Sequence, residues 1–202
     1  MVTEVDPRRR FEEGLEPYRI SVEQFRKMIE AGVFPDQVRL ELLGGFLFRT
    51  MTKNDPHNFV VGLLGAILNH LLGPAWFAQE EKSVVLGKFW RPEPDIAVVR
   101  GPRQQYRDRA PRAGDLGLLI EVSDVTYRKD RGVKWRRYAA VGIETYWIVN
   151  LALKQIEVYT DPSGKGKSAG YRTSQIYRSG DHVPVVLDGP EAGRIAVKDV
   201  LG

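Results

Sequence analysis

The sequence predicts a single α/β domain. Helix-like and strand-like segments alternate along its 202 residues, as they do in chains whose helices pack on a sheet. Residues 118–122 and 145–149 are apolar runs that suit buried central strands. The chain shows neither an internal repeat nor a second candidate core. We therefore expect residues 1–18 to form a flexible N-terminal arm and residues 19–202 to form one domain.

The N-terminal part predicts a helix followed by a β-hairpin. Ser21 and Gln24 form a capping box, an apolar stripe follows at helical spacing, and Gly32 ends the helix. Residues 39–42 then alternate between polar and apolar, a glycine pair follows, and residues 46–48 are apolar. This pattern is typical of a hairpin with a tight turn.

The rest of the chain predicts a second helix and a series of strands. We expect Asp55 to cap this helix and Pro56 to occupy its first helical position, and apolar residues then recur at helical spacing. Residues 100–116 read as a loop, residues 128–140 as a helix, and the last thirty residues as a small β meander. Short strands are expected at residues 76–79, 83–86, 95–99, 118–122, 145–149 and 155–160.

Composition excludes several classes of protein. Hydrophobic residues make up 43% of the chain and charged residues 28%, which is ordinary for a soluble globular protein. There is no cysteine, so disulfides, thiolate metal sites and cysteine nucleophiles are excluded, and we expect a cytoplasmic protein. No apolar run approaches the roughly 18 residues of a membrane helix. No glycine-rich phosphate loop or GxSxG motif supports a nucleotide cofactor or a triad hydrolase.

The positive charge is concentrated in one segment. Residues 100–137 hold eleven basic and five acidic side chains, a net charge of +6 in a chain whose total is +4. Such a segment either binds a polyanion through counterion release or is a solvated loop followed by a charged helix face.

Glu121 lies within an otherwise apolar predicted strand, at residues 118–122. A buried ionised carboxylate costs several kcal/mol unless it is paired or bound to a metal ion. We therefore expect Glu121 either to bind a metal ion or to form a structural ion pair with an arginine.

Lys134 is the predicted partner on the following helix. Counted at helical spacing from Tyr127, it falls on the stripe that faces the sheet, and so it faces Glu121. Lys134 is either a functional residue of a site or a snorkelling lysine whose only role is to pair with Glu121. Arg136 and Arg137 fall on the side that suits solvent or phosphate.

Glu41, Asp95 and His57 complete the candidates. Glu41 lies in the first strand of the hairpin, and Asp95 follows Pro94 at the start of a strand. His57 falls on the apolar stripe of its helix and is either a site residue or a satisfied core histidine. The three histidines have no metal-ligand spacing. Two carboxylates with a lysine suit metal-dependent phosphodiester cleavage, because carboxylate oxygens bind Mg²⁺ or Mn²⁺ and a lysine positions water or stabilises phosphate charge.

The order of these segments resembles the Uma2 family, formerly DUF820. The resemblance covers roughly residues 20–160, is most specific over residues 118–150, and is carried by ELLGG, DPHN, PDIAVV, LLIEVSD and DRGVKWRRYAAVGIETYWIVN. The family is described as restriction endonucleases of the PD-(D/E)XK superfamily. It implies a restriction-endonuclease-like core, a mixed β-sheet flanked by helices, with the hairpin and the C-terminal meander as additions.

The resemblance also implies roles for individual residues. Asp95 matches the aspartate of the PD motif, and Glu121 matches the acidic residue of the (D/E)XK motif. Ser123 stands where the superfamily has a lysine, and Lys134 matches the lysine that replaces it from the next helix. Two further polar positions typical of the family are matched by Glu41 and His57.

The leading functional hypothesis is a Mg²⁺- or Mn²⁺-dependent DNA endonuclease or nickase. In it, Asp95, Glu121 and the Val122 carbonyl bind the metal. Lys134 positions water, and Glu41 extends the metal site. The side chains expected to contact phosphates are Arg103, Arg107, Arg109, Arg136 and Arg137.

Two other functions stay open. One is a nuclease fold without turnover that binds nucleic acid or protein, which the serine at the lysine position favours. The other is a carboxylate-pair hydrolase acting on glycosides, for which the expected aromatic-rich loops are absent. Cleavage of both strands of a duplex favours a homodimer, and we expect its contact near Ile156, Val158, Tyr159 and the C-terminal meander.

Overall fold

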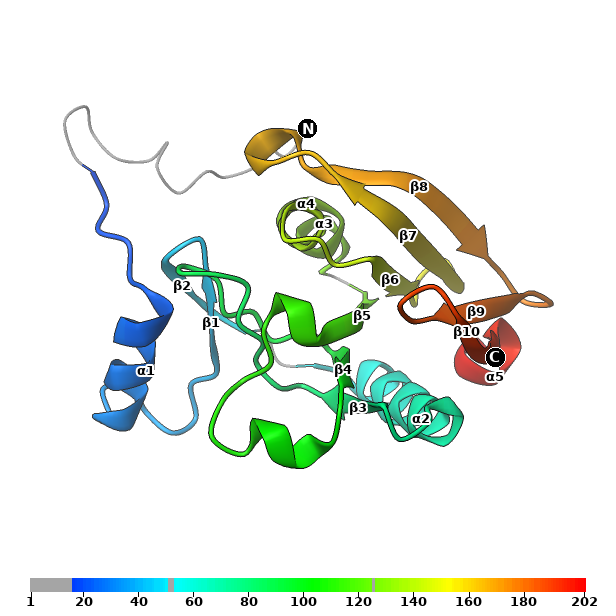
Figure 1. Cartoon of the computed structure of the whole chain (residues 1–202), viewed down its shortest axis with the longest axis horizontal. Coiled ribbons are helices and arrows are strands. Elements are labelled where there is room, and N and C mark those ends of the chain that lie inside the picture. Colours follow the sequence, from blue (N-terminus) through cyan, green and yellow to red (C-terminus); the bar gives the residue numbers. More distant parts are fainter. Residues whose placement is uncertain (1–15, 51–52, 125) are drawn as a thin grey trace.

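A six-stranded sheet with the strand order β3-β4-β5-β6-β7-β8 forms the centre of the protein (Figure 1). The computed structural model describes residues 16–50, 53–124 and 126–202. The strands are β3 (Trp76–Glu80), β4 (Ile96–Arg100), β5 (Leu116–Ser123), β6 (Thr145–Asn150), β7 (Gln155–Ser163) and β8 (Gly170–Tyr177). Strands β5 and β6 run parallel, and the other neighbours run antiparallel. The predicted α/β class with a mixed sheet is confirmed.

The parallel pair requires a crossover connection, and this connection carries the helix predicted over residues 128–140. It consists of α3 (Tyr127–Lys129), a π-helical turn η4 (Asp130–Lys134) and α4 (Trp135–Ala140). Tyr138 and Ala139 of α4 are buried with residues of β5 and β6 in one hydrophobic cluster. The crossover therefore covers one face of the sheet and fixes the side chains of η4 over β5.

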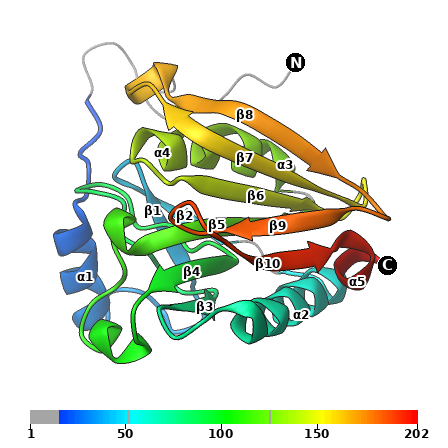
Figure 2. The ribbon, with the colours of Figure 1, turned by 45° about the vertical axis from the view of Figure 1, so that its right-hand side comes forward.

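The other face of the sheet is covered by α2 (Asp55–Leu71), by the hairpin of β9 (His182–Val186) and β10 (Glu191–Ala196), and by α5 (Val197–Leu201). Figure 2 shows α2 and α5 together on the side opposite α3 and α4. The apolar stripe of α2, which includes Val61, Leu64 and Leu68, is buried in this cluster. Each such side chain contributes about 1.5–3 kcal/mol by leaving water.

The N-terminal elements are α1 (Val22–Glu30), β1 (Leu40–Leu43) and β2 (Phe46–Arg49). The predicted capping box is present, with both of its hydrogen bonds. The predicted hairpin is present as well, and its two turn glycines have φ values of 66° and 91°, which this type of tight turn requires. Leu42 of β1 bridges to Arg91 rather than to the six-stranded sheet, and this places β1 beside the start of β4.

Three details of the sequence prediction are corrected. The cap of α2 is Asn54, whose Oδ1 accepts the His57 backbone N–H at 3.1 Å. Asp55 is the first helical residue, so Pro56 is the second and not the first. Residues 83–86 form no regular strand, because Val85 makes only an isolated bridge with Arg112. The loop predicted at residues 100–116 contains two short turns, η2 (Arg103–Tyr106) and η3 (Ala113–Asp115).

The C-terminal strands are divided between two sheets. Strand β8 extends the main sheet, β9 pairs only with β10, and α5 follows. The dimer contact predicted near Ile156, Val158 and Tyr159 is wrong, because β7 lies between β6 and β8 and all three side chains are buried. Of the predicted N-terminal arm, residues 1–15 lie outside the described residues. Within the described ranges, no helix has the length and apolar character needed to cross a membrane.

Candidate functional site

Six acidic side chains line one cavity of about 260 Å³ at the ends of β1, β4 and β5. The basic side chains on its wall are Arg39, Lys53, His57 and Lys129. The acidic ones are Glu41, Glu93, Asp95, Glu121, Asp124 and Asp130. Four of the five predicted catalytic residues are therefore on this wall, and the fifth, Lys134, lies behind it.

Asp95 and Glu121 are cross-strand neighbours. Ile96 of β4 is opposite Ile120 of β5 in an antiparallel pair, and one step further in the same register Asp95 is opposite Glu121. Such neighbours point to the same face, with Cβ atoms about 5 Å apart. Asp95 Oδ2 also accepts the backbone N–H of Val122 at 2.7 Å, so the two carboxylates share one end of the cavity.

The Val122 carbonyl is directed to the Asp95 side of β5. An extended residue points its N–H and C=O toward the same neighbouring strand, and the Val122 N–H points at Asp95. The next carbonyl, that of Ser123, accepts from Leu151 on the β6 side, as the alternation requires. The Val122 carbonyl, the third ligand that the sequence hypothesis names, thus lies on the Asp95 side of β5.

Lys134 lies beneath the carboxylates of the wall. Its Nζ is 2.8 Å from Glu121 Oε1, 3.2 Å from Glu41 Oε1 and 4.0 Å from Asp130 Oδ1, and its side chain is 2% exposed. The predicted orientation toward Glu121 is therefore observed. The ammonium reaches the cavity only through its carboxylate partners, whereas the sequence hypothesis had it positioning water directly.

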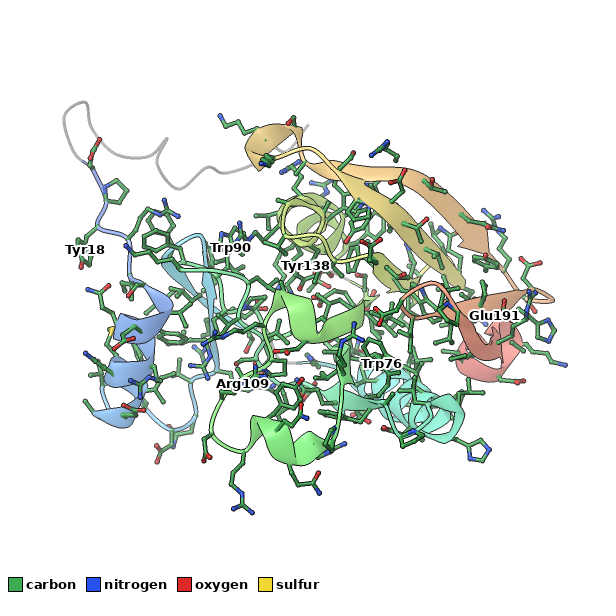
Figure 3. The ribbon with its side chains drawn as sticks, in the orientation of Figure 1. Tyr18, Trp76, Trp90, Arg109, Tyr138 and Glu191 are labelled. Atoms are coloured by element: carbon green, nitrogen blue, oxygen red, sulfur yellow. The ribbon has the colours of Figure 1, made fainter. Side chains whose placement is uncertain are left out.

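The turn η4 and helix α4 complete the surroundings of Glu121. Tyr138 donates its hydroxyl to Glu121 Oε1 at 2.7 Å, and Figure 3 shows this tyrosine in the middle of the molecule, beneath α4. Ser123 donates its hydroxyl to Asp130 Oδ2 at 2.7 Å. Short π-helical segments are frequent at functional sites, and this one buries both Asp130 and Lys134.

Glu41 is held by two lysines and one backbone group. Besides Lys134, its carboxylate accepts from Lys129 Nζ at 3.1 Å and from the Glu93 backbone N–H at 3.0 Å. Burial opposes its ionisation, but the charges of Lys134 and Lys129 prevail and lower the pKa of Glu41 to about 2. Glu41 is thus a fixed negative charge that anchors both lysines.

Asp95 is held by a histidine and a third lysine. His57 Nε2 is 3.2 Å from Asp95 Oδ2, and Lys53 Nζ is 2.5 Å from Asp95 Oδ1. Burial opposes ionisation here too, but the hydrogen bond from His57 and the charge of Lys53 hold the pKa of Asp95 well below its ordinary range. His57 is thus buried and paired with Asp95 on the wall of the cavity.

Glu121 differs from its two acidic neighbours. Complete burial raises the pKa of Glu121 to about 8, although the charge of Lys134 opposes the change and the charges of Asp130, Asp95 and Glu41 reinforce it. Burial alone would lower the pKa of Lys134, but four carboxylates raise it well above its ordinary value. The lysine therefore stays charged, while Glu121 is the carboxylate that can take up and release a proton near neutral pH.

The oxygen donors of this cavity suit Mg²⁺ or Mn²⁺, but they do not form a complete cage of protein ligands around a metal ion. Among the residues that the structure describes, no three His, Cys, Asp or Glu side chains are arranged to hold one metal ion. Mg²⁺ is commonly bound by one or two carboxylates and completes its shell with water and substrate phosphate. Asp95, Glu121 and the Val122 carbonyl can supply that smaller set of oxygen ligands.

The predicted phosphate-binding arginines lie apart from the cavity. Arg107, Arg109 and Arg137 line a separate groove of about 1290 Å³ between α1, residues 81–93 and the loop after β4. Arg109 pairs with Asp115 at 2.6 Å and lies on this outer loop in Figure 3.

The other basic side chains of residues 100–137 point in different directions. Arg103 donates to the Ala78 carbonyl at 3.2 Å, and Arg137 is half-buried and donates to the Leu86 carbonyl. Arg136 is partly exposed on α4. The excess of positive charge in residues 100–137 is thus not one surface, because Lys129 and Lys134 point inward to carboxylates.

Sequence reasoning missed Lys53, Lys129 and Asp130. Asp130 and Lys134 are four residues apart, and this spacing could have indicated that both face the sheet. Lys53 precedes α2 outside any periodic pattern, so nothing local distinguished it from a solvated lysine.

Comparison with known proteins supports the same fold. The model of the family Uma2, described as "Putative restriction endonuclease", matches residues 22–197. A crystal structure from Anabaena variabilis ATCC 29413, described as "a putative nuclease belonging to DUF820", superposes with a TM-score of 0.65. That match has 16% sequence identity and covers 90% of this chain and 97% of the other. No curated protein matches the sequence.

Proposed function

The chain belongs to the Uma2 family, and from this premise we propose that it is a divalent-metal-dependent DNA endonuclease or nickase that hydrolyses phosphodiester bonds. The observation that carries the proposal is the pairing of Asp95 with Glu121 across β4 and β5, above a buried lysine that bridges Glu121 to Glu41. A set of buried acids with one raised pKa, lining a cavity, is typical of a catalytic site. A cytoplasmic location is part of the same proposal.

Asp95, Glu121 and the Val122 carbonyl would hold the metal. When bound, Mg²⁺ or Mn²⁺ supplies Lewis acidity at the phosphate and lowers the pKa of coordinated water. Oxygen Oε1 of Glu121 is occupied by Lys134 and Tyr138, so Oε2 is the oxygen we assign to the ligand role. The pKa of this carboxylate is raised to about 8 by burial, so Glu121 would have to give up its proton near neutral pH to serve as a ligand.

Lys134 has a positioning role in this proposal. Its ammonium fixes Glu121 at 2.8 Å and Glu41 at 3.2 Å, so it sets the direction of the ligand carboxylate and offsets the repulsion between the acids. Glu41 in turn orients Lys129 on the cavity wall. His57 holds Asp95 Oδ2 from the first turn of α2.

Contacts to DNA outside the cavity are assigned to the groove with Arg107, Arg109 and Arg137 and, outside that groove, to Arg103 and Arg136. The groove adjoins the cavity region, because Glu93 lines both. Two protomers would be needed to cut both strands of a duplex, so a homodimer belongs to the endonuclease form of the proposal and a monomer to the nickase form.

A binding protein without turnover is the second candidate. The observation in its favour is that lysines already neutralise the carboxylates, with Lys53 on Asp95 and Lys134 on Glu121. Such a cluster could be stable without metal. Metal binding separates the two candidates, since only the enzyme requires it.

The test is a cleavage assay on supercoiled plasmid with Mg²⁺, with Mn²⁺ and with EDTA. We expect relaxed or linear product with either metal, none with EDTA, and none for Glu121→Gln. The matched control is Glu157→Gln, which makes the same change at a buried glutamate of β7 outside the cavity. Equal activity of wild type and Glu121→Gln, or activity in EDTA, contradicts the proposal.

A further inference from the structure

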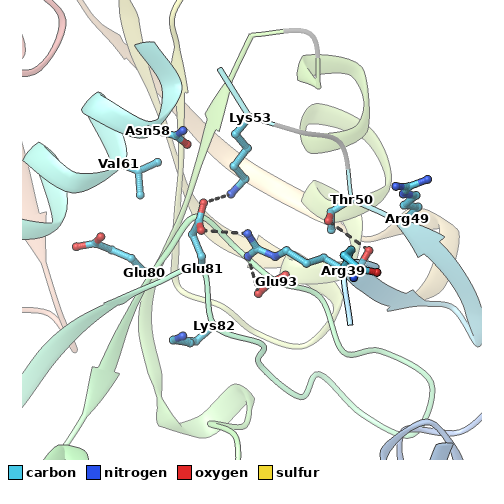
Figure 4. A pocket seen from close by; sticks show the side chains of 11 residues that line it. Arg39, Arg49, Thr50, Lys53, Asn58, Val61, Glu80, Glu81, Lys82 and Glu93 are labelled. Atoms are coloured by element: carbon cyan, nitrogen blue, oxygen red, sulfur yellow. Dashed lines mark hydrogen bonds and ion pairs between the residues drawn. The ribbon is translucent and has the colours of Figure 1, made fainter. Parts of the chain in front are cut away.

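Lys53 joins the acidic cavity to a neighbouring groove. Its side chain lines the 260 Å³ cavity and also a groove of about 790 Å³ that contains Arg39, Arg49 and Lys82. Figure 4 shows it reaching across this groove toward Glu81. It is 22% exposed, whereas the buried Lys134 is 2% exposed and does not line the cavity. Lys53 is therefore an ammonium that an incoming molecule can touch.

Lys53 occupies the oxygen that a metal ion would need. Asp95 Oδ2 already accepts from the Val122 N–H at 2.7 Å and lies 3.2 Å from His57 Nε2. Oδ1 is held by Lys53 at 2.5 Å. An ammonium and a divalent cation repel each other strongly at such distances. A cation bound at Asp95 Oδ1 must therefore displace Lys53.

A second carboxylate is in place to keep the displaced lysine at the rim. Lys53 Nζ is already 2.7 Å from Glu81 Oε1, and Glu81 Oε2 is 3.2 Å from Arg39. The backbone of Glu81 is fixed relative to the site, because its N–H donates to the Asp95 carbonyl at 3.0 Å. Its φ of 49° lies in the left-handed region, which costs a non-glycine residue about 1 kcal/mol. This conformation places the Glu81 carboxylate between Lys53 and Arg39.

We propose that Lys53 is a substrate-binding residue that rests on Asp95 in the metal-free protein and, once a divalent cation takes that carboxylate, stays on Glu81 and binds the phosphate of the entering nucleic acid. The inference rests on the proposed function. It assigns to Lys53 the direct phosphate contact that the buried position of Lys134 does not allow. Glu81 is a positioning residue in this account.

The first test is calorimetric titration of the protein with Mn²⁺, without DNA. In Lys53→Met the competing ammonium is gone, so we expect Mn²⁺ to bind about tenfold more tightly, the equivalent of about 1.4 kcal/mol. The matched control is Lys82→Met, which removes the same charge from an exposed lysine of the same groove. The control should leave Mn²⁺ affinity within about twofold of wild type, the equivalent of about 0.4 kcal/mol.

The second test is the kinetics of cleavage of a duplex oligonucleotide at saturating Mn²⁺. Lys53→Met should raise KM about tenfold or more with a smaller change in kcat, and Lys53→Arg should recover most of the loss, since a phosphate contact needs a cation. Unchanged or weaker Mn²⁺ binding in Lys53→Met overturns the inference and leaves the proposed function standing. Absence of Mn²⁺ binding in wild type and variant alike overturns both.

Discussion

Glu121→Gln should stabilise the folded protein, and the gain should grow with pH. The folded-state pKa of Glu121 is about 8, against an ordinary value of 4.5. Between these two values the folded protein binds a proton that the unfolded chain has lost, so the wild type loses stability as pH rises through this window. Glutamine keeps the shape and the Oε1 acceptor for Tyr138 and Lys134, but it cannot ionise.

The size of the effect follows from the same two values. The span from 4.5 to about 8 corresponds to at most about 5 kcal/mol, at about 1.4 kcal/mol for each tenfold change. Part of this is offset, because Lys134 loses one ionic partner and retains Glu41 at 3.2 Å and Asp130 at 4.0 Å. We therefore expect little difference between variant and wild type near pH 4.5 and a gain of about 2–4 kcal/mol above pH 8.

The assay is urea unfolding of the metal-free protein, followed by tryptophan fluorescence at several pH values from 5 to 9. Glu41→Gln is a control of opposite sign. The pKa of Glu41 is lowered to about 2, so its ionised form stabilises the fold throughout this range, and its replacement should destabilise by a nearly constant amount. A Glu121→Gln difference that does not change with pH, or that turns unfavourable at pH 8, would refute the reasoning.

Four further results are expected. Asp95→Asn should abolish Mn²⁺ binding in calorimetry while circular dichroism shows an intact fold. Lys134→Met should reduce plasmid cleavage about 10²-fold and lower the free energy of unfolding by about 3–5 kcal/mol, because it leaves buried carboxylates unpaired; Lys134→Arg should not restore full activity. DNA affinity should fall steeply with salt, and neutralising Arg103, Arg107 and Arg109 together should flatten that slope, whereas a salt-independent interaction would count against the arginine groove. Sedimentation should show a dimer at micromolar concentration if double-strand breaks are made, and a monomer would leave nicking as the activity.

Local pattern was sufficient to predict the elements that carry the site. The apolar run around Glu121 is strand β5, which is buried along its whole length. Helical spacing placed Lys134 toward the sheet, and its Nζ lies 2.8 Å from Glu121. These predictions succeed because periods of two and of about 3.6 residues are set by the backbone itself and are readable within one segment.

The convergence of the site was decided by tertiary structure alone. Glu41 comes from the hairpin, Lys53 from a loop, Asp95 from the residue before β4 and Glu121 from β5. No spacing in the sequence indicates that Lys53 lies 2.5 Å from Asp95. Burial of Tyr159 and its neighbours was also beyond local pattern, because an interior strand and an edge strand can have the same apolar sequence. The sequence by itself determined the central strands and the main helices and which side of each is apolar, but not the irregular course of residues 83–86 or the short helix α5. Apart from the Lys134–Glu121 pair, the packed fold decided which charges meet, because their partners are far apart in the chain and no local repeat in the sequence relates them.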